Sequence, residues 1–418
     1  MKRTVGDSDA MRRQNRGLVL DALRRHSPRS RTQLAGETGL SHATITAISA
    51  DMIRQGILED LRETQSDAHA RGRPAVSISF RREAGYVILF DITVNHAQVS
   101  LVDYAGTSID RVEMALGVES FANGGPANFL VARITQMKER NPAAAARILR
   151  AAVSVQGILE RDNSGLKWSP KRHLAGHDLV KEIGTRCGLP IALYKRGRLL
   201  AEGTRHTFPH LGTARVATVF VGSTVSMGLS MAQDVGDPVL APGADLATEF
   251  GHMVHQPDGA LCRCGARGCI EAYAADYGVL RSAFGVPADT APAPDVPDAT
   301  FQDLLDKARL GDRYVNHAFG VAGKVLGYGL NRLMTVFDPS HIVLVGPGST
   351  AFDYMRAEFE AALEASLVAR TQGVPEIMVH GDERELVHKG LVAKALGDID
   401  QNLFAAMPTR GGSLEIAK

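Results

Sequence analysis

Three of the four cysteines in this chain stand within eight positions, in the stretch GHMVHQPDGALCRCGARGCIEAY. Cys262, Cys264 and Cys269 supply three thiolates, and His252 supplies an imidazole ten positions before the first of them. Three sulfur ligands and one nitrogen ligand form a donor set suited to tetrahedral zinc. Because this set leaves no coordination position for water, the spacing predicts a structural Zn2+ and not a catalytic one.

The residues alone leave other interpretations of this stretch open. His255 is a second nearby imidazole and could replace His252, and the sequence CRC could be a redox pair. A disulfide is less favoured, because the chain opens MKRTVGDSDAMRRQ without a signal peptide and has no run of ~18 apolar residues that could span a membrane. These absences predict a cytoplasmic protein without membrane association, and cytosolic thiols stay reduced.

Charge is distributed unevenly along the chain. Residues 1–82 carry 15 Lys and Arg against 9 Asp and Glu, a net charge of +6, whereas the whole chain is +1. A basic head therefore precedes a mildly acidic body. Such an asymmetry favours a polyanionic partner for the head.

The head also has the helix signals of a DNA-binding motif. Ser30 followed by Gln33 is a capping box that starts a helix, and Gly39 is placed to end that helix. Ser41 can cap the next helix, SHATITAISADMIRQG, whose apolar residues fall on one face. Two helices joined by the short turn GLS predict a helix-turn-helix.

The second helix of such a motif places its amino end in the major groove, where short polar side chains reach base edges. The predicted base-edge residues are Ser41, His42, Thr44 and Thr46. Strands ILEDL and VSISF then flank a polar loop that contains ARGRP, which predicts a wing with Arg71 and Arg73 at the minor groove. The prediction for residues 1–82 is a winged helix-turn-helix that binds duplex DNA, and the alternative is a small helical domain that binds protein.

From Gly85 onward, apolar runs of strand length alternate with helical stretches, which predicts an α/β body of two lobes. YVILFDITVNHAQVSLVDYAG reads as a hairpin with Asp91 at its turn, an arrangement typical of actin-like and hexokinase-like ATPases. The predicted domains are residues 1–82 for the head, 83–194 plus 385–418 for a small lobe, and 195–384 for a larger lobe with the cysteines.

EFGHM followed by CRCGARGCIE resembles the signature of the ROK family of repressors, open reading frames and sugar kinases. The resemblance extends over nearly the whole chain, from the winged motif that ends in GRP, as in the family's N-acetylglucosamine and xylose repressor branch, to VFDPSHIVLVGPG. It implies a two-lobed, ribonuclease H-like body with a zinc loop. It also implies zinc ligands His252, Cys262, Cys264 and Cys269, and a sugar pocket bordered by Glu249, His252 and Glu271.

The family contains both kinases and repressors. Phosphoryl transfer requires glycine residues that leave backbone N–H groups open to phosphate, and a side chain that acts as a base. This chain departs from the kinase pattern at both kinds of position. Where the kinases resemble DxGGT, the chain has DITVN, and where they resemble GTGxGxG it has GSTVSMG. Alignment on LAE puts Leu193 and Tyr194 in place of the family's Asn-Asp pair. Tyrosine, with a pKa near ~10, is a poor base at neutral pH, so we expect no catalytic residues.

The segment LYKRGR brings Lys195, Arg196 and Arg198 to the position where the family keeps its Asn-Asp sugar contact. Cations favour carboxylate or phosphate partners, so one hypothesis is an acidic or phosphorylated sugar effector that contacts Arg196 and Tyr194 besides Glu249, His252 and Glu271. The alternative is that these cations are solvated at a helix start and that Tyr194 fills the vacated space.

Taken together, the sequence predicts a transcriptional regulator, a repressor of carbohydrate-related genes, whose body binds a sugar-like effector between its lobes. A homodimer or higher oligomer would present two recognition helices to a palindromic operator. Two alternatives stay open: a DNA-binding protein whose body only oligomerises and binds no effector, and a sugar kinase with a DNA-binding head.

Overall fold

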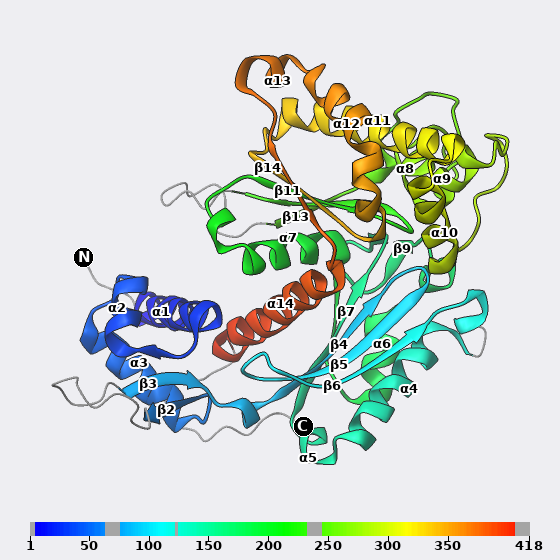
Figure 1. The fold of residues 1–418 in the computed structure, drawn as a ribbon. Coiled ribbons are helices and arrows are strands. Elements are labelled where there is room, and N and C mark those ends of the chain that lie inside the picture. Colours follow the sequence, from blue (N-terminus) through cyan, green and yellow to red (C-terminus); the bar gives the residue numbers. More distant parts are fainter. Residues whose placement is uncertain (1–4, 63–75, 122–123, 232–244, 406–418) are drawn as a thin grey trace.

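The chain begins with a helical head that carries a small sheet, at the left of Figure 1. The computed structural model describes residues 5–62, 76–121, 124–231 and 245–405. The head consists of α1 (Val5–His26), β1 (Arg29–Ser30), α2 (Arg31–Thr38), α3 (His42–Arg54), β2 (Leu58–Arg62) and β3 (Val76–Phe80). Its strands are antiparallel in the order β1-β3-β2.

The turn between α2 and α3 has the hydrogen bonds that the sequence predicts. Ser30 Oγ accepts from the backbone N–H of Gln33, whose side chain accepts from the Ser30 N–H at 2.8 Å. Gly39 ends α2 with a φ of 69°, in the left-handed conformation that glycine tolerates. Ser41 Oγ accepts from the backbone N–H of Thr44 and so starts α3. The helix-turn-helix is therefore present.

A five-stranded sheet forms the small lobe. Its strands are β4 (Tyr86–Ile92), β5 (His96–Asp103), β6 (Ser108–Ala115), β7 (Ile148–Val155) and β10 (Ile191–Lys195), in the order β10-β7-β4-β5-β6. Helices α4 (Gly125–Arg140) and α6 (Leu179–Cys187) bury Leu130, Ile134 and Ile183 against one face. A short α5 (Pro142–Ala145) and a hairpin of β8 (Ile158–Leu159) and β9 (Leu166–Trp168) complete it.

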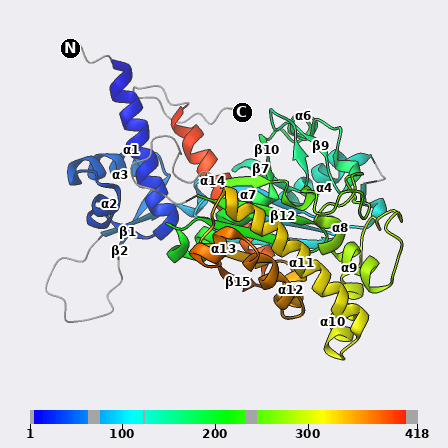
Figure 2. The same cartoon turned by 90° about the horizontal axis from the view of Figure 1, so that it is seen from above.

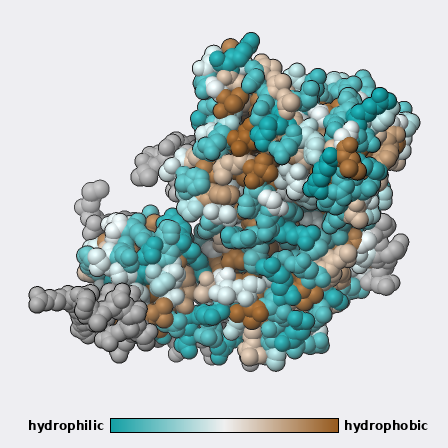
Figure 3. Space-filling view, viewed as in Figure 1, coloured by the Kyte–Doolittle hydropathy of each residue, from teal (hydrophilic) through white to brown (hydrophobic). Residues whose placement is uncertain are grey.

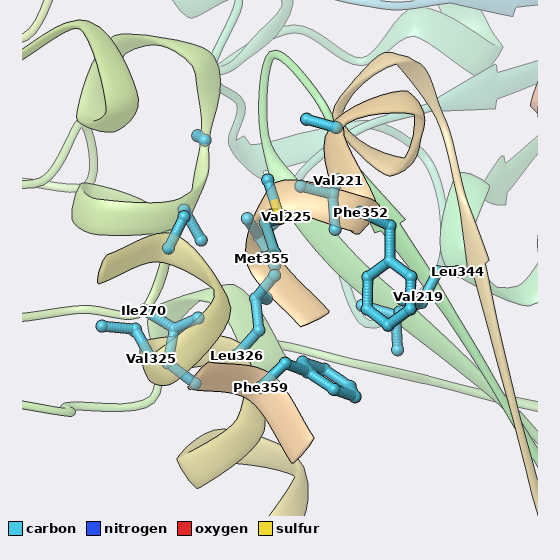
Figure 4. Packing of buried hydrophobic residues seen from close by; sticks show 14 of the residues in the cluster. Val219, Val221, Val225, Ile270, Val325, Leu326, Leu344, Phe352, Met355 and Phe359 are labelled. Carbon is cyan, nitrogen blue, oxygen red and sulfur yellow. The ribbon is translucent and has the colours of Figure 1, made fainter. Parts of the chain in front are cut away.

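A second five-stranded sheet forms the large lobe, with strand order β13-β12-β11-β14-β15. These strands are β11 (Val216–Val221), β12 (Val225–Ser230), β13 (Asp245–Thr248), β14 (His341–Val345) and β15 (Glu376–His380). The helices are α8 (Glu271–Ala274), α9 (Asp276–Ala283), α10 (Asp298–Arg309), α11 (Arg313–Val336), α12 (Phe352–Glu364) and α13 (Leu367–Gln372). Figure 4 shows Val219 and Leu344 of the sheet packed against Phe352 and Phe359 of α12.

Two helices, α7 (Arg196–Thr207) and α14 (Glu383–Ala405), lie between the two sheets (Figure 1). α7 packs against β11, β12 and β13 of the large lobe, and α14 packs against α7 and against β4 of the small lobe. A Cβ on Gly203 of α7 would lie 1.9 Å from the carbonyl oxygen of Leu386, and a Cβ on Gly390 of α14 would lie 2.0 Å from that of Leu199. The helices therefore cross with backbone against backbone.

The head rests on the body where α1 lies beside α14, as Figures 1 and 2 both show. Arg24 of α1 donates from Nε and Nη2 to both carboxylate oxygens of Asp400 on α14, at 2.9 and 3.1 Å. Tyr104 donates its hydroxyl to Asp400 Oδ1 at 2.5 Å. The Arg24 guanidinium also stacks 3.7 Å over the ring of Phe80. A mostly buried polar cluster thus connects the head to both lobes.

The domain boundaries predicted at 194/195 and 384/385 fall at the last residue of β10 and in the first turn of α14. No helix in the described part of the chain is long and apolar enough to cross a membrane. Figure 3 shows a largely hydrophilic surface on this face, with hydrophobic residues gathered on its upper part, over the large lobe. The predicted α/β fold of two lobes with a helix-turn-helix head is confirmed.

The close crossing of α7 and α14 leads to a testable difference between two glycines of α14. Gly390→Ala is expected to lower the free energy of unfolding by about 1–3 kcal/mol, because the methyl group would overlap the Leu199 carbonyl. The control is Gly397→Ala, whose Cβ would meet nothing within 4 Å and which should gain up to about 1 kcal/mol from helix propensity. Urea unfolding followed by circular dichroism compares them, and equal stabilities would contradict the crossing.

Candidate functional site

The predicted metal ligands come together beside the large-lobe sheet. His252 lies in the 3-10 turn Phe250–His252, and the three cysteines lie in the loop that leads to α8. The four ligand atoms all lie within 4.8 Å of one another. The Sγ atoms of Cys264 and Cys269 are 3.8 Å apart, and tetrahedral zinc with ~2.3 Å bonds to sulfur also spaces its sulfurs by about 3.8 Å. The cluster can therefore hold a metal ion in a closed four-coordinate site.

The loop around the cluster depends on a close backbone approach. Gly268 has a φ of 75°, and a Cβ there would lie 1.6 Å from the carbonyl oxygen of Gln256. The carbonyl of Gly268 accepts from the backbone N–H groups of His255 and Gln256. The ring of His255 packs instead beside Tyr273 and Tyr328, with ring centroids 6.0 Å apart in each case. The cluster therefore contains His252 and not His255.

A small pocket lies between the lobes and shares His252 with the metal cluster. The small lobe contributes the only tryptophan of the chain, Trp168, whose ring stands edge-to-face on the His252 ring at 5.1 Å. The pocket encloses about 30 Å3, which is room for a few water molecules. Its lining residues are Val155, Gln156, Gly157, Trp168, Pro170, Lys195, Arg196, Gly197, Thr224, Val225, Ser226, Thr248, Glu249, His252 and Glu271.

The two glutamates that the resemblance places at the sugar pocket have different surroundings. Glu271 is 1% exposed, and burial raises the pKa of its carboxyl group. Its oxygens accept from the backbone N–H of Val225 at 3.2 Å and from the hydroxyl of Tyr277 at 3.3 Å. Glu249 is exposed and forms an ion pair with Lys195. The pocket thus presents one buried carboxyl group and one ion pair to a ligand.

Arg196 lines the pocket, but its charge is already compensated. Its Nε and Nη2 lie 3.2 and 3.3 Å from the carboxylate oxygens of Asp91, which also accepts from Ser154 Oγ at 2.7 Å. Arg196 and Asp91 are both buried, and the guanidinium lies 4.8 Å from the ring of Phe220. Its Nη1 has no hydrogen-bond partner among the described residues. The third cation, Arg198, is exposed and does not line the pocket.

Both cations that the acidic-effector hypothesis places at the pocket are paired with carboxylates. Lys195 and Arg196 each have a carboxylate partner, so the two positive charges at the pocket are balanced by Glu249 and Asp91. A ligand that carries a carboxylate or phosphate would have to compete with these ion pairs.

Tyr194 turns away from the pocket that it was predicted to line. Its hydroxyl donates to Asp398 on α14 at 2.8 Å, and its ring belongs to the apolar core around that helix. Burial raises the pKa of this phenol above its usual value. Sequence reasoning missed Gln156, Trp168, Thr224 and Ser226, because they come from separate strands and loops and form no local motif.

The predicted DNA contacts on α3 fall into two groups. Ser41 and Thr44 are engaged with each other, since Ser41 Oγ accepts from the Thr44 N–H and lies 2.8 Å from its hydroxyl. His42 and Thr46 are exposed, and the same face of α3 carries the exposed residues Ala43, Ala47 and Ala50, which sequence reasoning did not single out. Small side chains let a helix approach the floor of a groove closely. Arg71 and Arg73 lie outside the described residues.

A sequence model of the ROK family matches residues 87–390. The xylose repressor of Bacillus spizizenii is 24% identical over 81% of this chain and 84% of its own length. The N-acetylglucosamine repressor of Escherichia coli O157:H7 is 21% identical over 92% of this chain and 93% of its own length. The matched length thus extends beyond the body in relatives that are named repressors.

Solved structures share the fold. The crystal structure of a ROK family transcriptional regulator, a homologue of the MLC protein of E. coli, covers 94% of this chain and 98% of its own, with a TM-score of 0.70 and 19% identity. A ROK family glucokinase from Streptomyces griseus, in complex with glucose and AMPPNP, covers 75% of this chain and 99% of its own, with a TM-score of 0.54 and 22% identity. The kinase fold therefore corresponds to the body without the head.

The buried Arg196–Asp91 pair gives a stability prediction. Asp91→Ala should lower the free energy of unfolding by about 3–5 kcal/mol, because it leaves the Arg196 guanidinium buried without its carboxylate. Asp91→Leu combined with Arg196→Met should recover much of this loss, since no buried charge remains. As a control, Asp306→Ala removes the exposed pair with Arg309 and should cost less than about 1 kcal/mol. Similar losses for Asp91→Ala and Asp306→Ala in urea unfolding would refute the prediction.

Proposed function

This chain belongs to the ROK family, and we propose that it is a DNA-binding transcriptional regulator, a repressor of carbohydrate-related genes, and not an enzyme. Its body binds a sugar-like effector between the lobes and performs no phosphoryl transfer. The observation that carries the proposal is the buried Arg196–Asp91 ion pair on a body that is joined to a helix-turn-helix head. Relatives over most of the chain length are named repressors, which supports the same assignment.

The ion pair argues against phosphoryl transfer. In the kinase pattern the Asp of the first glycine turn serves the phosphate site, and here Asp91 is bound by Arg196 and Ser154. The position of the catalytic base holds Tyr194, which donates to Asp398 away from the pocket. Phosphoryl transfer requires a metal-accessible carboxylate and a positioned base. Both groups are committed to other partners in this chain.

The pocket is suited to an uncharged sugar. Glu271 and Glu249 offer acceptors for hydroxyl groups, while Lys195 and the unpartnered Nη1 of Arg196 offer donors. Trp168 supplies an aromatic surface, which sugars use to bury their C–H faces. Because the pocket volume is small, binding of a sugar would be helped by movement of the lobes apart or by opening of the Lys195–Glu249 pair. Effector binding would thus be coupled to lobe geometry.

The helix pair α7 and α14 provides a path from the pocket to the head. Arg196 at the pocket is the first residue of α7, α7 crosses α14, and α14 carries Asp400, which binds Arg24 of the head. A change in the angle between the lobes would therefore move α1 and, with it, α3. In a homodimer or higher oligomer, such a movement changes the spacing of the two recognition helices on a palindromic operator.

We assign Zn2+ as the structural ion of the four-ligand cluster, because three thiolates and one imidazole are ligands that zinc binds in closed tetrahedral sites. The ion would hold the loop that carries His252 and leads directly to Glu271. Its role is to fix the pocket wall, and no ligand position remains for a catalytic water.

The DNA-binding proposal predicts that a negative charge on the exposed face of α3 weakens DNA binding. Ala47→Glu should lower affinity for the operator by about 10- to 100-fold, because it places a carboxylate on the exposed face that meets the phosphate-lined groove. Ala361→Glu, the same change on an exposed position of α12, is the control. Fluorescence anisotropy with labelled operator at several salt concentrations measures both affinity and its salt dependence. Equal operator affinities for these two variants would be incompatible with α3 as the recognition helix.

The effector proposal is testable through the single tryptophan. The protein would be titrated with neutral sugars such as xylose or N-acetylglucosamine and, separately, with their phosphorylated counterparts. Binding of the neutral sugar should change the fluorescence of Trp168. Glu271→Gln should weaken that binding by about 1.5–3 kcal/mol, the scale of a hydrogen bond to a charged group, whereas the exposed Glu139→Gln should leave it unchanged. Preference for the phosphorylated member, or ADP release from Mg-ATP with any of these sugars, would contradict the proposal.

The metal assignment predicts one zinc ion per chain by native mass spectrometry. Cys264→Ser should abolish retention of the ion and lower the melting temperature, because one thiolate of four is lost. Cys187→Ser, which changes the one cysteine outside the cluster, should retain the ion. Stable reduced protein that contains no zinc would rule the assignment out.

A further inference from the structure

A second and larger cavity, of about 210 Å3, lies between the lobes and shares no lining residue with the pocket described above. The small lobe contributes Thr93 and Asn95 from the turn between β4 and β5. The large lobe contributes Ser223, in the turn between β11 and β12, and Asp298 at the start of α10. Asn95 Nδ2 donates to Asp298 Oδ1 at 2.8 Å, so the two lobes meet at this cavity.

The cavity combines an apolar floor with an acidic wall. Phe220, Val296, Phe301 and Leu305 are buried apolar residues on its surface. Its carboxylates are Asp276, Asp298 and Glu383, and the only lysine or arginine in its lining is Arg384. Arg384 itself lies 3.7 Å from Glu113, outside the cavity lining. The lining therefore holds three carboxyl groups against one guanidinium, and burial raises the pKa of Asp276 to about 7.

Two of the three carboxylates, Asp298 and Glu383, form no close ion pair within the described part of the chain. Asp276 lies 3.6 Å from Arg263, but no lysine, arginine or histidine of the described residues lies within ion-pair distance of Asp298 or Glu383. Burial raises the pKa of Glu383, while the charges of Arg196 and Arg384 act in the opposite direction and lower it. A cation in the cavity would lower this pKa further.

A hydroxyl group that lines the same cavity forms no hydrogen bond with the described residues. Ser223 is only 8% exposed and lines the cavity, yet its Oγ forms no hydrogen bond with any residue that the structure describes. Ser223 Oγ therefore offers an unused donor and acceptor for a ligand.

We propose that this cavity is a second small-molecule site, which takes a ligand with an apolar ring and an ammonium group and rejects polyanions. The ring packs on Phe220 and Phe301, and the ammonium group donates to the carboxylates of Asp298 and Glu383. Phosphate groups are disfavoured, because they would stand among like charges in a site partly shielded from water. The site shares no lining residue with the sugar pocket. A ligand bound there would lie beside the contact between the lobes at Asn95 and Asp298.

Phenethylamine is a suitable probe, since it carries a ring and an ammonium group, and phenylacetate is its anionic counterpart. Titration of the full-length protein by saturation-transfer NMR and calorimetry should give at least about tenfold tighter binding of phenethylamine, which corresponds to ~1.4 kcal/mol. Mg-ATP should neither bind nor displace it. Tighter binding of Mg-ATP or phenylacetate, or no binding of phenethylamine, would overturn the proposal.

Substitutions in the cavity lining test whether phenethylamine binds there. Asp298→Asn combined with Glu383→Gln should lower phenethylamine affinity by about tenfold, since it removes two charges, while an Asn side chain at 298 can still accept from Asn95. Glu139→Gln combined with Glu182→Gln changes two exposed carboxylates on α4 and α6 and should have no effect. Thr350→Trp, at an exposed position of the lining, should block binding by filling the cavity. Equal losses in the two double variants, or undiminished binding to Thr350→Trp, would place the probe elsewhere and refute the site.

Discussion

The arrangement of this molecule depends on how closely α7 and α14 approach each other. Gly203 and Gly390 stand where a Cβ would overlap a backbone carbonyl of the opposite helix, and Gly228 of β12 has the same relation to Gly197 of α7. Interiors pack at close to crystalline density, so such contacts transmit displacement and do not absorb it. Both sheets rest on this helix pair, and the head rests on α14. The two sheets and the head thus all contact this helix pair.

The buried charge at the start of α7 adds a second constraint. Arg196 is held by Asp91 of the small lobe, although α7 itself packs on the large-lobe sheet. Removing either partner would leave a buried charge, which costs more than the pair contributes. The pair therefore links the two lobes at the pocket.

The segment that carries the four predicted metal ligands contacts both cavities between the lobes. His252 is both a ligand of the cluster and a wall of the small pocket, while Arg263, between two of the cysteines, donates to the backbone carbonyl of Ser223 at the larger cavity. Arg263 also donates to the carbonyl of Ala293 at 2.9 Å. A bound ion would restrain these contacts together, so the metal cluster has consequences well beyond its four ligands.

The sequence by itself determined the parts whose partners are near in the chain. The capping box of Ser30 and Gln33 spans three positions, and the four metal ligands span fewer than twenty, so their spacing was enough to predict the helix-turn-helix and the cluster. The alternation of strand-length apolar runs and helical stretches after Gly85 predicted the α/β body of two lobes, and the resemblance to the ROK family implied the same architecture. Only the tertiary structure decided the partners of the cations at the pocket. Lys195 binds Glu249 and Arg196 binds Asp91, across 54 and 105 positions, and Tyr194 binds Asp398 across 204. The physical reason is that the charge available to a ligand is the charge left after pairing, and pairing between distant segments is set by how the lobes pack, which no local pattern of residues encodes.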